Sequence, residues 1–113
     1  MLLQIPKKSE SILPVVQQFK EELKMYYGSR LNQLILYGSY ARGTQWKESD
    51  IDLLVVLNDI NSEVEEINKL AELKIDLMLK YDVYISPNPT TTEKYLNSDL
   101  PLFVNIHKEG IEI

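Results

Sequence analysis

Cysteine is absent from the 113 residues, and histidine and tryptophan occur only once each. Without cysteine the chain can form neither disulfides nor thiolate metal sites, and this composition suits a cytoplasmic protein. No run of about 18 apolar residues occurs, so the sequence predicts no membrane span. The N-terminal segment also lacks the basic and apolar stretches of a secretory signal. We therefore expect a cytoplasmic protein that does not bind membranes.

Positive charge is scarce as well. The chain has 12 lysines and arginines against 17 aspartates and glutamates, which gives a net charge of −5. Sequence-independent binding to DNA or RNA depends on clustered lysine and arginine, so no direct nucleic-acid binding is expected. An acidic chain is better suited to bind divalent cations or a basic protein partner.

Length and composition predict one globular domain, residues 1–113. The chain can bury one core but has little room for a second module. Hydrophobic residues make up 44% and charged residues 26%, as in ordinary globular proteins.

Apolar spacings of three and four residues predict two long amphipathic helices, at 11–27 and 62–80. Ser9 or Ser11 is the expected N-cap of the first. The second carries an apolar face made of Val64, Ile67, Ala71, Ile75 and Met78. Shorter helices are predicted at 92–97 and 102–108.

Strands are predicted at 34–37, 51–57 and 82–86, with a last short strand at 111–113. Ile51–Leu57 is apolar on both alternations, which is typical of a strand covered on both faces. Pro87-Asn88-Pro89 is expected to end the third strand. This order indicates an α+β fold, with one small mixed β-sheet of three or four strands flanked by helices.

Asp50 and Asp52 stand at the entrance of the apolar strand. Two residues apart on a strand, their side chains point to the same face, about 7 Å apart. Two such carboxylates repel each other when partly desolvated, and a divalent cation between them removes that cost. Oxygen ligands favour Mg²⁺ or Mn²⁺ over Zn²⁺. The alternative is a solvated strand end, but the strongly apolar residues that follow favour a site.

Gly38 and Ser39 form a tight turn after the strand at 34–37. A glycine there lets the chain turn sharply and lets a phosphate approach the backbone amides. Arg42, one helical turn later, is placed to neutralise phosphate charge. The alternatives are an ordinary turn with Ser39 as N-cap, and a surface arginine paired with Glu48 or Asp50.

A third carboxylate is expected near the pair. Asp82 opens the predicted strand at 82–86, and if that strand is a neighbour, Asp82 is a third metal ligand or the general base. Asp76 is the other candidate for the third carboxylate, although its position is also explained by a solvated helix face.

Trp46 either stacks on a base, contacts a partner or anchors its loop. His107 is expected to be a helix-end residue.

The residues Gly38-Ser39, ten further residues and Asp50-Ile51-Asp52 match the GSx₁₀DxD signature of the DNA-polymerase-β-like nucleotidyltransferase superfamily. The longer string GSYARGTQWKESDIDLLVVL resembles the minimal nucleotidyltransferase (MNT) family. The resemblance implies the nucleotidyltransferase fold. Asp50, Asp52 and Asp82 would be the catalytic metal ligands, and Gly38 and Ser39 would form the phosphate-binding turn.

The resemblance also implies an activity: transfer of a nucleoside monophosphate to a hydroxyl acceptor, with release of pyrophosphate. ATP is the expected donor, and Mg²⁺ is the expected cofactor, with two ions in the site. Single-domain members are often encoded beside a HEPN-domain toxin, and some act as antitoxins that adenylylate a tyrosine of that toxin. Because this chain has no room for an acceptor domain, we expect a partner protein to supply the hydroxyl.

Two alternatives remain at this point. One is a non-catalytic antitoxin that blocks its partner by binding alone, and the other is a nucleotidyltransferase for a small molecule. An exposed edge strand or an apolar helix face would also allow a homo-oligomer.

Overall fold

The computed structural model of the chain describes residues 5–113. These residues form a four-stranded mixed sheet in the order β3-β2-β1-β4, in which only β2 and β3 are parallel. The elements in chain order are η1 (Lys7–Ile12), α1 (Leu13–Tyr27), η2 (Gly28–Arg30), β1 (Leu31–Tyr37), α2 (Ser39–Arg42), β2 (Ile51–Leu57), α3 (Glu63–Tyr81), β3 (Ile85–Thr91), α4 (Thr92–Asn97), α5 (Pro101–Glu109) and β4 (Ile111–Glu112). The predicted α+β class and mixed sheet are confirmed.

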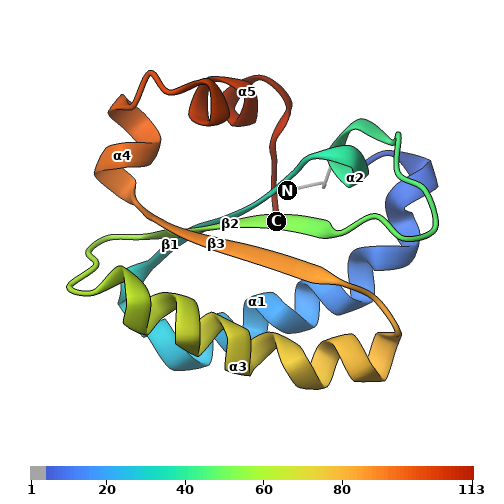
Figure 1. Cartoon of the computed structure of the whole chain (residues 1–113), viewed down its shortest axis with the longest axis horizontal. Coiled ribbons are helices and arrows are strands. Elements are labelled where there is room, and N and C mark those ends of the chain that lie inside the picture. The colour runs from blue at the N-terminus through green and yellow to red at the C-terminus, as the bar shows by residue number, and fades with distance from the viewer. Residues whose placement is uncertain (1–4) are drawn as a thin grey trace.

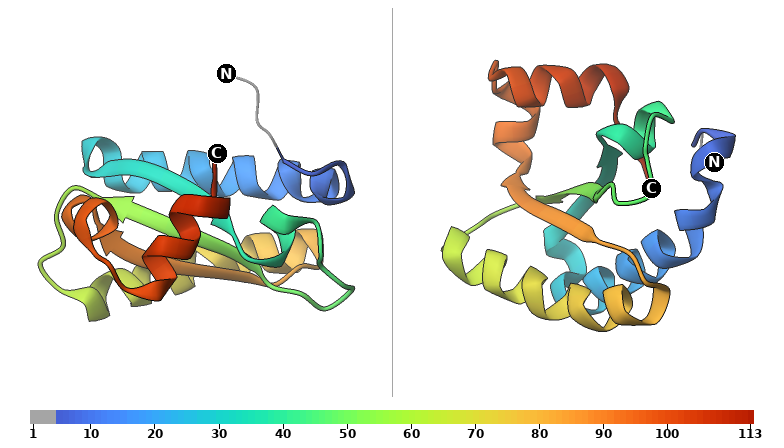
Figure 2. Two further views of the ribbon diagram at one scale, coloured as in Figure 1. Left: turned by 90° about the horizontal axis from the view of Figure 1, so that it is seen from above. Right: turned by 45° about the vertical axis from the view of Figure 1, so that its right-hand side comes forward.

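The sheet separates two cores of unequal size. Helices α1 and α3 cover one face, and α4 and α5 lie over the other (Figures 1 and 2). Leu53 and Val55 of β2 belong to the larger core under α1 and α3. Leu54 and Val56 pack on the opposite face with Phe103 of α5. β2 is therefore covered on both faces, as its apolar sequence predicts, and its bounds are those expected.

The start of α1 differs from the prediction. Neither serine caps the helix: the residue at the N-cap is Ile12, the last residue of the 3-10 helix η1. Ser9 is completely buried, and its Oγ donates a hydrogen bond to the carbonyl oxygen of Tyr40 at 2.6 Å. The hydroxyl that sequence reasoning assigned to helix capping instead ties η1 to the segment after β1.

Helix α3 forms as predicted, with Ser62 as N-cap accepting from the Glu65 N–H. The predicted apolar face, however, largely points to solvent. Val64, Ile67 and Ile75 are 67%, 53% and 52% exposed, whereas the buried residues are Glu66, Leu70 and Leu77. The helix carries two apolar stripes, and only contact with α1 and the sheet decides which one is covered.

The predicted strand 82–86 is wrong in its bounds, because β3 runs from Ile85 through both prolines to Thr91. Among the strands of residues 5–113, β3 lies at an edge of the sheet and pairs only with β2. The Ile51 N–H donates to the Tyr84 carbonyl oxygen at 2.8 Å, so alternate residues from Tyr84 onward turn their backbone groups toward β2. Pro87 and Pro89 fall on the other alternation, where no N–H is needed.

A polar network joins α3 to the connection between α1 and β1. Glu66 is only 7% exposed and accepts from the Tyr27 hydroxyl at 3.1 Å and from the Arg30 guanidinium. Arg30 also donates to Asp59 at 2.9 Å. A buried carboxylate is costly when unpaired, and these donors offset that cost where α3 packs.

None of the helices in residues 5–113 has the length and hydropathy needed to cross a membrane.

Replacing Arg30 with alanine leaves the buried Glu66 carboxylate without its cationic partner. We expect Arg30→Ala to lower the free energy of unfolding by about 2 kcal/mol. The matched control is Arg42→Ala, whose ion pair with Glu109 is more exposed and should cost less than about 1 kcal/mol. Urea unfolding followed by circular dichroism measures both, and equal losses would contradict the assigned role of Glu66.

Candidate active site

Asp52 is the second residue of β2 and lies on the side of the sheet that faces α4 and α5, and Asp50 directly precedes the strand. Asp52 pairs in register with Tyr37 of β1 and shares its face of β2 with Leu54. Asp52 is half-buried, whereas Asp50 is exposed. Since Asp50 lies outside β2, the expected placement of both carboxylates on one face stays a prediction.

The electrostatics of Asp52 fit a cation site. Burial raises the pKa of the Asp52 carboxyl, the nearby Asp50 charge raises this pKa further, and Arg42 lowers it. A bound divalent cation would offset both the burial and the repulsion, and two carboxylates are ligands that Mg²⁺ accepts. The donor set at Asp50 and Asp52 thus fits the expected metal.

Gly38 brings the turn after β1 directly against Asp52. It has φ +76°, a conformation that side chains disfavour. A Cβ at this position would collide with Asp52 Oδ2 and lie 3.2 Å from its Cγ. Any side chain here would require the Asp52 carboxylate to move, so the backbone of the turn lies directly against this carboxylate.

Ser39 is the first residue of α2, and Gly38 rather than Ser39 occupies the N-cap. The Gly38 carbonyl oxygen accepts from the Ala41 and Arg42 N–H groups, both at 3.1 Å. The first amides of a helix have no acceptor within the helix and are available to an anion. The interpretation of Ser39 as a capping residue is therefore wrong, and its predicted role at a phosphate stays a prediction.

Arg42 pairs with neither of the two carboxylates considered from sequence. Its Nη1 donates to Glu109 Oε1 at the end of α5, at 2.9 Å. It remains close enough to lower the pKa of Asp52. The ion pair is largely exposed and so is weak. Arg42 can therefore exchange Glu109 for a phosphate at little cost.

The structure places Asp82 before β3, which begins at Ile85. Asp82 is exposed at the C-cap of α3, with φ 54° in the left-handed region, and it does not open a strand. Asp76 is exposed on α3 itself. Within residues 5–113 no three Asp, Glu, His or Cys side chains are grouped to hold a metal ion. The expected group of three carboxylates is therefore not formed in this part of the chain, and the role of Asp82 stays a prediction.

Sequence reasoning missed a polar row across three strands. Ser86 of β3 stands opposite Asp52, which stands opposite Tyr37. Asn88 Nδ2 donates to the Tyr37 hydroxyl at 2.8 Å, so this bond spans β2 beside Asp52. Only the register reveals this row, since its members are separated by up to 51 positions.

His107 lies in the last turn of α5 against the Tyr95 carbonyl, as a helix-end residue.

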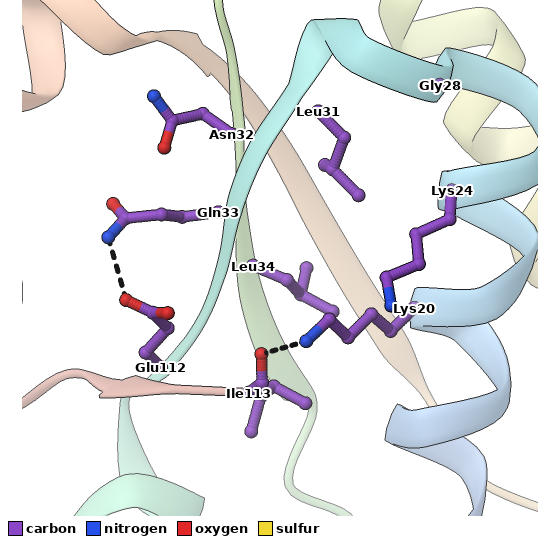
Figure 3. Close-up of a pocket in the computed structure, with 9 residues that line it drawn as sticks. All are labelled: Lys20, Lys24, Gly28, Leu31, Asn32, Gln33, Leu34, Glu112 and Ile113. Atoms are coloured by element: carbon purple, nitrogen blue, oxygen red, sulfur yellow. Dashed lines mark hydrogen bonds between the residues drawn. The ribbon is translucent and has the colours of Figure 1, made fainter. Parts of the chain in front are cut away.

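A cavity of about 240 Å³ lies elsewhere, between α1 and the β1–β4 edge. Figure 3 shows Lys20 and Lys24 on one side and Glu112 on the other. Lys20 Nζ donates to the Ile113 carbonyl at 2.6 Å. None of its lining residues belongs to the Asp50–Asp52 pair or the Gly38 turn, so this cavity is separate from the site.

Two glycines with positive φ allow a controlled test of the contact at Gly38. Gly28→Ala adds a methyl group where no atom lies within 4 Å, so only backbone strain of about 1 kcal/mol is expected. Gly38→Ala adds the same strain and also displaces Asp52, so we expect a loss of about 3 kcal/mol or more. Urea unfolding compares the two, and equal losses would contradict the close approach.

Comparison with known proteins identifies the family. A family model described as the nucleotidyltransferase domain matches residues 16–110. The chain is 34% identical to MJ0141 of Methanocaldococcus jannaschii, provisionally named a protein adenylyltransferase, over 67% of this chain and 76% of that protein. It is 35% identical to protein adenylyltransferase MntA of Thermococcus cleftensis, over 63% of this chain and 76% of the relative.

Among solved structures, a toxin–antitoxin crystal structure with AMP-PNP is similar in fold. Its TM-score is 0.59 at 22% identity, over 85% of this chain and 70% of that chain. The predicted fold and enzyme class are confirmed. Because the matched residues include both the Gly38-Ser39 turn and the Asp50–Asp52 pair, the protein belongs to the nucleotidyltransferase domain family.

Proposed function

We propose that this protein is a Mg²⁺-dependent protein adenylyltransferase that acts as an antitoxin. It would transfer AMP from ATP to a hydroxyl of a partner, expected to be a tyrosine of a HEPN-type toxin encoded nearby. Family membership, the names of the relatives and the AMP-PNP in the similar toxin–antitoxin structure support this proposal. ATP as donor also agrees with the expected cytoplasmic location.

The observation that carries the proposal is the contact of Gly38 with Asp52. Phosphates held by the turn would lie beside the carboxylates, and Arg42 would offset part of their charge. The acceptor oxygen would then attack the α-phosphorus, the bond from that phosphorus to the bridging oxygen would break, and pyrophosphate would leave.

Asp50 and Asp52 would hold the metal, which when bound neutralises phosphate charge and activates the attacking hydroxyl. Ser86, rather than a third carboxylate, stands opposite Asp52 on the neighbouring strand. Because Asp82 does not join the pair in a group of three carboxylates within residues 5–113, we assign the hydroxyl proton to water or to a base of the partner protein.

Two isosteric variants separate the roles of the aspartates. Asp52→Asn should reduce AMP transfer to the partner by at least about 100-fold, because it removes a charged metal ligand. Asp82→Asn should stay within about twofold of the unmodified protein, since asparagine tolerates the left-handed conformation at this exposed site. The measurement is transfer of labelled AMP to the purified partner. A loss of activity in Asp82→Asn would restore the three-carboxylate interpretation.

The placement of Asp82 also favours a second candidate, an antitoxin that blocks its partner by binding alone. Under this candidate, Asp50→Asn combined with Asp52→Asn would neutralise the toxin without ATP as well as the unmodified protein does. Under the adenylyltransferase proposal, neutralisation would need ATP and would fail in the double variant. Toxin activity assayed with and without ATP decides between them. Labelling of a small hydroxyl compound without any partner would instead indicate a small-molecule transferase.

A further inference from the structure

The loop between α2 and β2, residues 43–50, carries the single tryptophan of the chain. Trp46 is 67% exposed, so it does not anchor the loop to the domain as one interpretation of the sequence suggested. An indole ring offers a large apolar surface with one polar N–H group. A partner that covers this ring gains binding free energy from the burial of apolar surface.

The backbone under Trp46 is nevertheless fixed. Its N–H donates to Ser49 Oγ at 3.0 Å, and the Ser49 N–H donates to the Trp46 carbonyl oxygen at 3.0 Å. On the other side, Gln45 Nε2 donates to the Lys8 carbonyl oxygen at 2.8 Å. The ring is thus held on an ordered turn without being covered, and binding through it would cost little loss of backbone freedom.

A second exposed aromatic residue lies at the same end of the sheet. Tyr84 is 58% exposed, and its carbonyl oxygen accepts from the Ile51 N–H at 2.8 Å. Ile51 pairs with Ile85, and this register continued by one residue places Tyr84 beside Asp50. The α2–β2 loop and the α3–β3 connection project at the same end of the sheet in Figure 1. We call Trp46 and Tyr84 the aromatic rim.

We propose that the aromatic rim docks the acceptor polypeptide beside the carboxylate pair. This inference rests on the proposed function, whose acceptor is a protein. Both rings are more than half exposed. A protein surface can cover both rings, and tryptophan and tyrosine are the residues most often found as anchors of protein interfaces.

Fluorine NMR provides a direct test, because the chain has only one tryptophan. The protein is labelled with 5-fluorotryptophan, and the unlabelled HEPN-type protein encoded by the neighbouring gene is the probe. We expect the single resonance to stay in place with Mg²⁺ and a non-hydrolysable ATP analogue and to move when the partner is added. A shift with the nucleotide alone, or none with the partner, overturns the proposal.

Kinetics test the same surface independently. Trp46→Ala and Tyr84→Ala should each raise the KM for the partner roughly tenfold or more, with kcat and the Kd for ATP within about twofold. Trp46→Phe should recover part of the loss. Met25→Ala and Leu79→Ala are the matched controls, because these side chains are 85% and 79% exposed on α1 and α3 and should change no constant.

The outcomes separate the two proposals. If the unmodified protein transfers no AMP to the partner, the proposed function fails, and the fluorine shift still decides whether the rim binds it. If AMP is transferred with an unchanged KM in both alanine variants, or if the control variants raise the KM equally, the aromatic rim is not the docking surface.

Discussion

The contact between the Gly38 backbone and the Asp52 carboxylate is the constraint on which the site depends. It exists because β1 and β2 are antiparallel neighbours, so the end of one strand meets the start of the other. A side chain at position 38 would require the Asp52 carboxylate to move. The positions of the Gly38 turn and of Asp52, for which we propose phosphate binding and metal binding, are therefore set by the register of two central strands.

The two cores have different roles: the larger stabilises the sheet, and the smaller leaves Asp52 accessible to ligands. The larger core under α1 and α3 immobilises the strands, and the smaller one fixes α5 to the opposite face. Asp52 lies on the same face as the smaller core and is only half-buried. This partial burial is enough to raise the pKa of Asp52 while leaving the carboxylate accessible to ligands. The end of α5 reaches α2 through Arg42 and Glu109, and so it helps to shape the site.

Local patterns in the sequence predicted the central part of the fold well. The apolar run Ile51–Leu57 and the spacing from Gly38 to Asp52 depend on neighbours in the chain, and both were read correctly. Features set by contacts between distant residues could not be predicted in the same way. Arg42 forms its ion pair with Glu109, which is 67 positions away in the chain. Packing against α1 and the sheet determines which apolar stripe of α3 is buried.

Asp82 shows most clearly where prediction from local sequence patterns fails. An aspartate before an apolar run looks like the start of a strand, but α3 extends to Tyr81 and Asp82 ends it in a left-handed conformation. The true strand begins at Ile85 and contains two prolines, a pattern that is acceptable only because β3 is at the edge of the sheet. Edge position is a property of the topology, and no local window contains it.

The prolines of β3 have a consequence for the behaviour of the protein in concentrated solution. An unprotected edge strand offers a row of amide donors to any other extended chain, which is a common route to aggregation. Pro87 and Pro89 delete two donors from the outward side of β3, so a further strand added there would lack those hydrogen bonds. The two prolines that make β3 hard to recognise in the sequence therefore also disfavour the addition of another strand at this edge.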